Sequence, residues 1–473
     1  MEPRYIAAIE IGSSKIKGIV AAVDATSTIT VTGLEESPTG GAVRYGRVQN
    51  AREVSEIADD IIRRLENRPG IAPATVTDVF IANGGRSLSS ALTEATVRQG
   101  GDVEVTELTL QRLQQAAMAN LATNADVLAI SARKYTRDGA EVKNIVGTYG
   151  NTIHGQFTFV TCSPENKRNL ERVKVSSHGR ELTPHYITRV LAQAENLLTD
   201  DDRQRGCLLI DFGAETTTLA VFRKDALQMV SALPMGSNNI TRDLSTGLSI
   251  TEDSAENIKI TKGMAVAERV AMETPDAETR EIINYVSARA GEIIANIINR
   301  LSQTDFKEAD LPAGIVITGG GSRLRGFNEM LEQQTHMKVR AAVPDRAVRI
   351  AVPGMNVADN IDLIAMVRYA ANHSDITCLE RPATVTTETR VETPAAGGAA
   401  GAPAPAGNPR RRIIDDDDPD LLNDDDDEPL EDDLPPQGPT PEKTRESLKQ
   451  RFLNWLAPKT SAPDEADEEL NEE

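Results

Sequence analysis

Two segments of the 473-residue chain repeat one short plan, and this repeat constrains the fold more than any other feature. Residues 5–20 read YIAAIEIGSSKIKGIV, and residues 207–222 read CLLIDFGAETTTLAVF. Each segment has an apolar run, a carboxylate near the end of that run (Glu10, Asp211), a turn of small residues and a second, alternating apolar run. This pattern predicts a β-hairpin. Two such hairpins, about half the core apart, predict a duplicated fold with two similar lobes.

Helix-like and strand-like segments alternate over the first 380 residues, which predicts an α/β fold. We expect helices over residues 51–66, 108–122, 183–198, 254–262, 281–301 and 326–334. We expect strands over residues 76–82 and 314–318, in addition to those of the hairpins.

The turns of the two hairpins are candidate phosphate cradles, because turn N–H groups can hold anionic oxygens and small residues let a phosphate approach. The candidate residues are Gly12, Ser13, Ser14 and Lys15 in the first turn, and Gly213, Ala214, Thr216 and Thr217 in the second. Glu10 and Asp211 are candidates for holding the water shell of a magnesium ion that bridges phosphates. For either hairpin taken alone, an ordinary turn is the better interpretation.

A third motif, GIVITGGGS at residues 314–322, changes that balance. An apolar strand leads directly into Gly319, Gly320, Gly321 and Ser322, and the open backbone of three glycines can lie against a planar base. Glu256 and Lys259 share a helix face at i and i+3 and could hydrogen-bond a ribose or a base edge. By themselves these two residues would be an ordinary surface pair.

The formal net charge of -21 is concentrated at the C-terminal end. Residues 415–433 hold 13 acidic residues and no Lys or Arg, and residues 464–473 hold 7 more. The charge argues against nucleic-acid binding and indicates solvated spacers. The three cysteines lack metal-ligand spacing, which predicts free thiols in a reducing cytosol. We expect neither a signal peptide nor a membrane span, since there is no run of 18 apolar residues.

A short amphipathic helix is predicted over residues 443–457, between two acidic stretches. Its apolar stripe consists of Leu448, Phe452, Trp455 and Leu456 at helical spacing. Lys449 and Arg451 flank the stripe, where their stems can lie along the membrane interface. We favour membrane binding, because an independent helix on a disordered linker can reach a surface. A helix that docks on the core or on a partner is the alternative.

Taken in order, the two hairpins, the Glu-x-x-Lys helix and the triple glycine resemble the actin, sugar kinase and heat-shock chaperone ATPase superfamily. Within it the chain is similar to the FtsA family of bacterial cell-division proteins. The segments that carry this likeness are residues 10–13, where glutamate replaces the more usual aspartate, and residues 79–90, 198–203 and 235–244.

The resemblance implies an actin-like two-lobed fold that binds ATP with Mg²⁺ and assembles with itself into filaments. It also implies binding to the C-terminal tail of FtsZ, recruitment of other division proteins, and membrane attachment on the inner face of the cell membrane at the septum. It implies these parts: 1–83 and 162–198 (subdomain 1A), 84–161 (1C), 199–251 and 312–377 (2A), 252–311 (2B, which would bind FtsZ), 378–442 (disordered acidic linker), 443–457 (membrane helix) and 458–473 (acidic tail).

The chain departs from the family pattern in two places. The second phosphate motif has Ala214 and Glu215 where relatives usually carry glycines, and Glu215 adds negative charge unless it faces away. Hydrolytic relatives carry Glu or Gln where this sequence places Arg189 or Val190, so we expect slow hydrolysis at most. Two alternatives stay open, a small-molecule kinase of the same superfamily and an actin-like adaptor of another assembly, such as a pilus machine.

Overall fold

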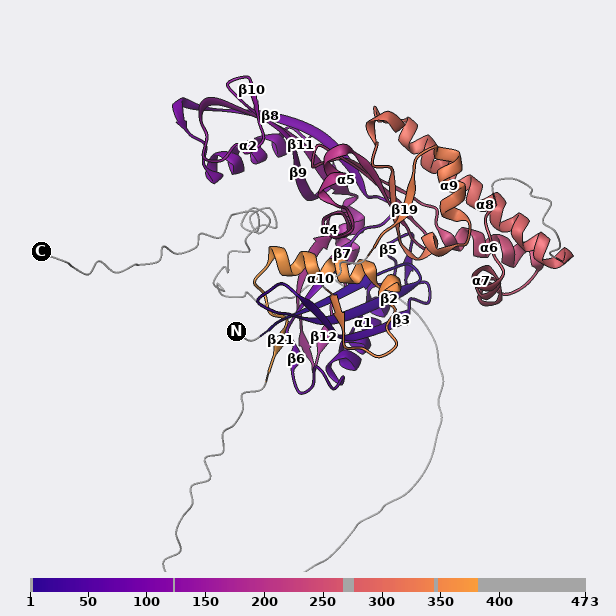
Figure 1. Ribbon diagram of the computed structural model, residues 1–473. Helices are drawn as coiled ribbons and strands as arrows, with labels where there is room; N and C mark the ends of the chain where they lie inside the picture. Colours follow the sequence, from indigo (N-terminus) through magenta and orange to yellow (C-terminus); the bar gives the residue numbers. More distant parts are fainter. Residues whose placement is uncertain (1–2, 122–123, 267–275, 344–347, 382–473) are drawn as a thin grey trace, which may run out of the picture. The chain divides into compact units, whose positions relative to one another are not determined.

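The computed structural model describes residues 3–121, 124–266, 276–343 and 348–381. Two large sheets dominate these residues (Figure 1). The first has the order β14-β7-β1-β2-β3-β20, with bounds Thr183–Thr188, Asp78–Asn83, Arg4–Ile11, Lys15–Val23, Ile29–Pro38 and Val348–Ile350. The second has the order β10-β9-β11-β8-β17-β16-β15-β18-β19, with bounds Ala140–Val142, Asp126–Arg137, Tyr149–Cys162, Ser89–Glu104, Ala226–Leu233, Thr217–Arg223, Cys207–Phe212, Ile315–Thr318 and Val339–Ala341.

The predicted duplication is confirmed by the order and direction of the strands. In the first sheet β1, β2 and β3 form an antiparallel meander, and β7 and β14 add to it as parallel strands. In the second sheet β15, β16 and β17 form the same meander, and β18 and β19 add to it in the same parallel manner. Five strands of one lobe therefore repeat five strands of the other.

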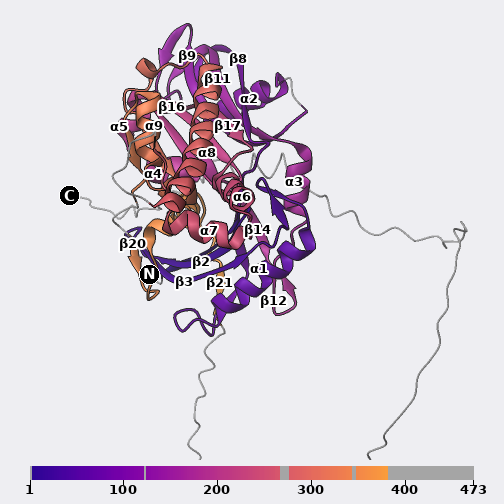
Figure 2. The ribbon, with the colours of Figure 1, turned by 90° about the vertical axis from the view of Figure 1, so that its right-hand side faces the viewer.

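Helices cover the sheets and connect their strands (Figure 2). Their bounds are α1 Ala51–Glu66, α2 Glu107–Ala119, α3 Pro164–Glu171, α4 Arg189–Leu197, α5 Asp200–Arg205, α6 Ser237–Leu248, α7 Glu252–Thr261, α8 Ala277–Ser302, α9 Phe327–Thr335 and α10 Ile361–His373. Short 3₁₀ turns are η1 Glu308–Asp310, η2 Gly320–Arg323 and η3 Val357–Asp359. Small strand pairs are β4 Val43–Arg44 with β5 Arg47–Val48, β6 Thr75–Val76 with β21 Leu379–Glu380, and β12 Ser176–Ser177 with β13 Arg180–Glu181.

Each lobe has its own apolar core. In the first lobe α1 packs on β2 and β3, and α10 packs on β1 and α4. Four successive residues of β1, from Ile6 to Ile9, are buried, so both faces of that sheet are covered. In the second lobe one core cluster joins β15 and β16 to α6, α8 and α9.

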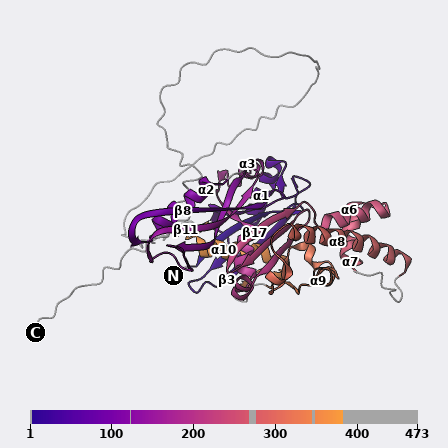
Figure 3. The same cartoon turned by 90° about the horizontal axis from the view of Figure 1, so that it is seen from above.

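The segment from β8 to β11 is an insertion that extends the second sheet (Figure 3). It has a core of its own, which includes Leu113, Phe157 and Phe159. Its backbone pairing with the rest of that sheet is one residue pair, Ser89 with Ser231. The predicted boundaries 84–161 enclose nearly all of this segment, and the subdomain assignment remains a proposal.

One expected helix, residues 183–198, is wrong in its first third. Residues 183–188 form strand β14, parallel to β7, and the helix begins at Arg189. The strand contains Tyr186, Ile187 and Thr188, residue types that favour a pleated sheet. Their pairing with β7 outweighs the helical periodicity that continues from α4. The other expected helices and strands are present, with ends shifted by a few residues.

Candidate functional site

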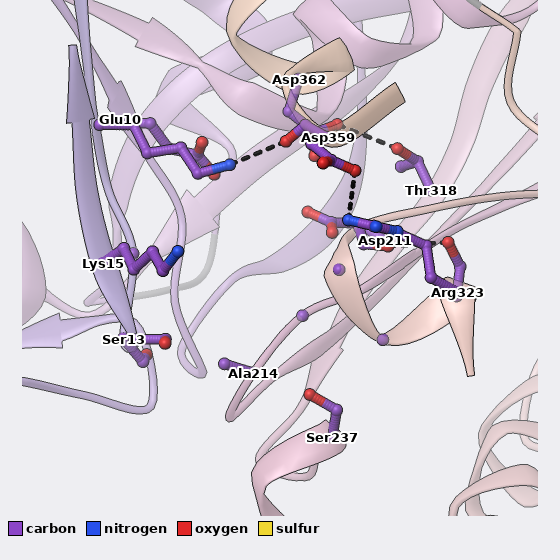
Figure 4. Close-up of a pocket in the computed structure, with 18 of the residues that line it drawn as sticks. Glu10, Ser13, Lys15, Asp211, Ala214, Ser237, Thr318, Arg323, Asp359 and Asp362 are labelled. Atoms are coloured by element: carbon purple, nitrogen blue, oxygen red, sulfur yellow. Dashed lines mark hydrogen bonds and ion pairs between the residues drawn. The ribbon is translucent and has the colours of Figure 1, made fainter. Parts of the chain in front are cut away.

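A cavity of about 1110 Å³ lies where the two hairpin turns and the triple-glycine segment meet (Figure 4). All but one of the predicted phosphate-, base- and metal-binding residues line it: Glu10, Gly12, Ser13, Ser14, Lys15, Asp211, Gly213, Ala214, Thr216, Glu256, Lys259, Gly319, Gly320, Gly321 and Ser322. The exception is Thr217, which is fully buried and donates its hydroxyl to the carbonyl of Met235.

The first turn is closed by the N–H of Gly12, which donates to the carbonyl of Lys15 at 3.0 Å. The hydroxyl of Ser13 accepts a bond from the N–H of Gly46, in the tip between β4 and β5. The Lys15 ammonium contacts Glu36 at 2.6 Å, and about half of each side chain is exposed. An exposed pair of this kind adds little stability, so Lys15 can exchange Glu36 for a bound anion at low cost.

The second turn has the same backbone closure, from the N–H of Gly213 to the carbonyl of Thr216 at 2.9 Å. The start of α6 holds it from behind: Ser237 and Asn238 donate their N–H groups to the carbonyls of Gly213 and Ala214. Ala214 is absent from the described residues with positive φ, so it fits this turn without strain.

The triple-glycine segment follows strand β18. Gly319 has φ +87°, and an added Cβ would lie 2.4 Å from the carbonyl oxygen of Phe212, so only glycine fits there. A Cβ on Gly321 would lie 2.8 Å from the Phe212 ring. A Cβ on Gly320 would meet no atom within 4 Å. Gly320 therefore faces open space in the cavity, as expected of a surface for a planar base.

Glu256 and Lys259 share a face of α7, as predicted, and they bind each other at 2.6 Å. The Lys259 ammonium also donates to the hydroxyl of Thr241 at 2.9 Å. Burial lowers the pKa of Lys259, and the Glu256 carboxylate opposes that shift. The pair forms a polar wall of the cavity on α7, whereas both phosphate turns belong to β-hairpins.

An arginine joins the carboxylates of the two hairpins. Arg189, the first residue of α4, places Nη1 3.1 Å from Glu10 Oε1 and Nη2 3.1 Å from Asp211 Oδ2. Burial by itself lowers the pKa of Arg189, but Asp211, Glu10 and Asp362 raise it above its usual value. The guanidinium is thus a permanent cation between equivalent positions of the two lobes.

Gln193 and Asp362 complete this cluster. The Gln193 amide donates to Asp211 Oδ2 and to Asp362 Oδ1, each at 3.0 Å. The hydroxyl of Thr318 donates to the same Asp362 oxygen at 3.1 Å. Burial, followed by the charges of Asp211 and Glu10, raises the pKa of Asp362 to about 7.

Glu215, which we expected to be unfavourable beside phosphate, faces away from the cavity. Its buried carboxylate accepts the N–H of Tyr45 at 2.7 Å and pairs with Arg44 and Arg242. Arg44 and Tyr45 belong to the first lobe, whereas Glu215 and Arg242 belong to the second. The unusual residue therefore ties the lobes together behind the second turn.

A family model described as "Cell division protein FtsA" matches residues 208–366. Proteins named Cell division protein FtsA from Neisseria meningitidis serogroup B and Pseudomonas aeruginosa are each 29% identical to this chain, over 72% of it and over 84% and 83% of their own lengths. The Escherichia coli K12 protein of that name is 23% identical over 72% of this chain and 84% of its own length. The chain is therefore similar to the FtsA proteins over most of its length.

A solved structure is similar to the chain in its fold. The chain aligns with a chain of the PilM-PilN type IV pilus biogenesis complex with a TM-score of 0.53 and 16% sequence identity, over 77% of this chain and 97% of that one. The predicted actin-like α/β fold is confirmed. Within the described residues, no helix combines the length and the apolar character that a membrane span requires.

Glu10 and Asp211, the two carboxylates predicted to hold the water shell of Mg²⁺, are paired with protein side chains. Asp211 Oδ2 already accepts from Arg189 and Gln193, and its Oδ1 lies against the backbone of Gly319. Glu10 is paired with the same guanidinium. Across the described residues, no group of three or more His, Cys, Asp or Glu side chains could hold a metal ion. The carboxylates proposed for Mg²⁺ are thus bound to an arginine.

Sequence reasoning missed Gln193, Asp362 and Lys17 as parts of the site. The ammonium of Lys17 lies at the cavity wall, 2.8 Å from the carbonyl of Asp359. Only Gln193 had a usable signal, because it follows Arg189 by one helical turn. The predicted membrane residues, from Leu448 to Leu456, lie outside the described residues.

Proposed function

We propose that this chain is an actin-like cell-division protein that binds ATP in the cavity between the hairpin turns. The observation that carries the proposal is the convergence of two small-residue turns and Gly320 on one cavity. The turns and Lys15 would take the phosphates, Gly320 the base, and Glu256 with Lys259 the ribose or the base edge. The names of the relatives favour division over a pilus adaptor or a small-molecule kinase.

Gly320→Val tests the nucleotide site. The new side chain points into open space, so the protein should fold normally while the base is blocked. We expect ATP affinity, measured by calorimetric titration, to fall by about tenfold or more. Gly101→Val is the matched control: its Cβ would meet only Val103, at an ordinary contact distance of 3.8 Å, its φ is not positive, and it lies in the insertion. Unchanged ATP affinity in Gly320→Val would place the base elsewhere.

Hydrolysis is proposed to be slow. The residue at the start of α4 that faces both hairpin carboxylates is Arg189, which cannot act as a base. Gln193 lies one turn further on, and its amide nitrogen is engaged by two aspartates. Phosphate release measured with excess ATP should stay below about 1 per second, the low end of ordinary enzymes.

The membrane tether is a proposal from the sequence. The helix at residues 443–457 would lie in the membrane interface at the septum, with 378–442 as the linker and 458–473 as an acidic tail. Phe452→Glu with Trp455→Glu should abolish sedimentation with liposomes in the presence of ATP. Gln450→Glu with Asn454→Glu adds the same charge to the opposite face and should retain it. Equal sedimentation of both double variants would exclude this helix as the anchor.

The proposed partners are the C-terminal tail of FtsZ, further copies of this chain and other division proteins. The FtsZ tail is assigned to residues 252–311, which include α7 and α8. A cross-linking map of the chain with an FtsZ tail peptide tests this assignment. Cross-links confined to residues outside 252–311 would contradict it.

A further inference from the structure

The two hairpin carboxylates already share a cation that belongs to the protein. Glu10 and Asp211 hold equivalent positions in the duplicated lobes, and Arg189 places one terminal nitrogen against each of them, both at 3.1 Å. The side chains of Arg189, Glu10 and Asp211 are 17%, 16% and 6% exposed. A guanidinium in such a fork is well ordered and stays charged.

All three of these residues line the cavity proposed for the nucleotide. A bound triphosphate in the turns would therefore lie near two carboxylates that share the single positive charge of Arg189. Lys15 and Lys17 add two further cations from the first hairpin. These three side chains supply cationic groups at the place where a nucleotide site usually holds a divalent cation.

We infer that Arg189 is the resident cation of this site and that it makes ATP binding by this chain largely independent of Mg²⁺. The inference rests on the proposed nucleotide site and goes beyond it, because a nucleotide site can equally depend on the metal. It also assigns Arg189 a positioning role, since its two terminal nitrogens hold the carboxylates of Glu10 and Asp211.

Replacing Arg189 should make ATP binding depend on Mg²⁺. In Arg189→Gln the two carboxylates lose their balancing charge, so they repel free ATP and can instead hold the water shell of a Mg²⁺ ion. Arg189→Lys keeps the charge without the two-pronged geometry, so it should behave between the parent and Arg189→Gln. Arg223→Gln removes an arginine that pairs with Asp310 away from the cavity, and it serves as the matched control.

The experiment is calorimetric titration of the full chain with ATP, once in excess MgCl₂ and once in excess EDTA. We expect the parent and Arg223→Gln to change affinity by less than about threefold between the buffers, and Arg189→Gln to lose about tenfold or more in EDTA. A second readout needs no nucleotide: MgCl₂ alone should raise the melting temperature of Arg189→Gln and leave that of the parent unchanged.

The outcomes separate the two claims. Parent binding that is lost in EDTA overturns this inference and leaves the proposed function standing. Absence of ATP binding in both buffers overturns both. If Arg189→Gln binds ATP equally in the two buffers, Arg189 is not the cation that matters. If Arg189→Gln fails to fold, the two parent titrations and Arg189→Lys still decide the question.

Discussion

The two hairpins have the same backbone but different side chains. In the strand register, Glu10 of β1 lies opposite Lys17 of β2, and Asp211 of β15 lies opposite Thr218 of β16. The two carboxylates thus hold matching positions before the turn. Each turn is closed by the same hydrogen bond from its glycine. The turn residue Ser14 of the first hairpin is exposed, whereas its counterpart Glu215 in the second is buried.

The difference shows how one backbone plan can serve two tasks. The first hairpin presents two lysines, and these are charges that a nucleotide can use. The second hairpin offers alanine and threonine to the cavity and uses its acid, Glu215, to bind the opposite lobe. We expect substitutions in the first hairpin to change ligand affinity, and substitutions in the second to change stability.

The largest effect is expected for Glu215→Ala compared with Ser14→Ala. The loss of Glu215 leaves two arginines and a backbone N–H without their acceptor, so the free energy of unfolding should fall by about 2–3 kcal/mol. Ser14→Ala should change it by no more than about 0.5 kcal/mol, because the site is exposed. Urea unfolding measures both. Equal losses would contradict the assignment of the lobe contact to the second hairpin.

Next in size is Lys15→Ala, which should weaken ATP binding by about tenfold, since one charge-assisted contact to phosphate is lost. The stability of the fold should hardly change, because the Lys15–Glu36 pair is half exposed. Lys262→Ala is the control: it breaks a comparably exposed pair, with Glu278, outside the cavity. Calorimetric titration separates the two variants, and equal affinities would remove Lys15 from the phosphate site.

A smaller effect concerns Asp362, whose pKa of about 7 lies above its value in the unfolded chain because of burial and of the charges of Asp211 and Glu10. A raised pKa stabilises the fold below the unfolded value, and this contribution is lost as the pH rises through about 7. Asp362→Asn removes that loss, so it should raise the free energy of unfolding by about 1 kcal/mol at pH 8 relative to the parent. Urea unfolding of the parent and of Asp362→Asn between about pH 4 and about pH 8 measures how the free energy of unfolding depends on pH. The same pH dependence in both proteins would contradict the prediction.

The smallest effect is expected for the pKa of Asp362, which compares the carboxylates of the two hairpins. Asp211 raises the pKa of Asp362 more than Glu10 does. Asp211→Asn should therefore move the pH at which stability declines further toward acid than Glu10→Gln does. Titration of the Asp362 carboxyl by NMR in the two variants measures the shift directly. A larger shift in Glu10→Gln would mean that the first hairpin dominates this cluster.

Local patterns predicted the site because its chemistry lies on contiguous motifs. Gly12, Gly213 and Gly319 each follow a strand, and each of the two carboxylates stands out near the end of an apolar run. The duplicated lobes followed from the same two hairpins. The lining of the cavity agrees with these predictions except at Thr217, whose side chain is buried behind the turn.

The rest depended on tertiary pairing that no local pattern contains. Asp362 reaches the site because α10 packs on α4 and β1, and nothing around residue 362 signals a buried acid. Glu215 is held away from the cavity by ion pairs, and one of its partners, Arg44, comes from a distant hairpin. Strand β14 was mistaken for a helix because its partner, β7, lies about a hundred residues earlier.

The contact between Gly46 and Gly85 has a consequence for how such a chain can evolve. A Cβ on Gly46 would lie 2.5 Å from the Cα of Gly85, and a Cβ on Gly85 would lie 2.5 Å from the carbonyl oxygen of Gly46. Both residues also have positive φ. The base of the insertion thus rests on the tip of β4 and β5 through a close main-chain contact, beside which the Arg86 guanidinium lies over the Tyr45 ring. Side chains elsewhere in the insertion can diverge in response to new partners without disturbing this attachment, while the two glycines themselves have no viable single-step substitution.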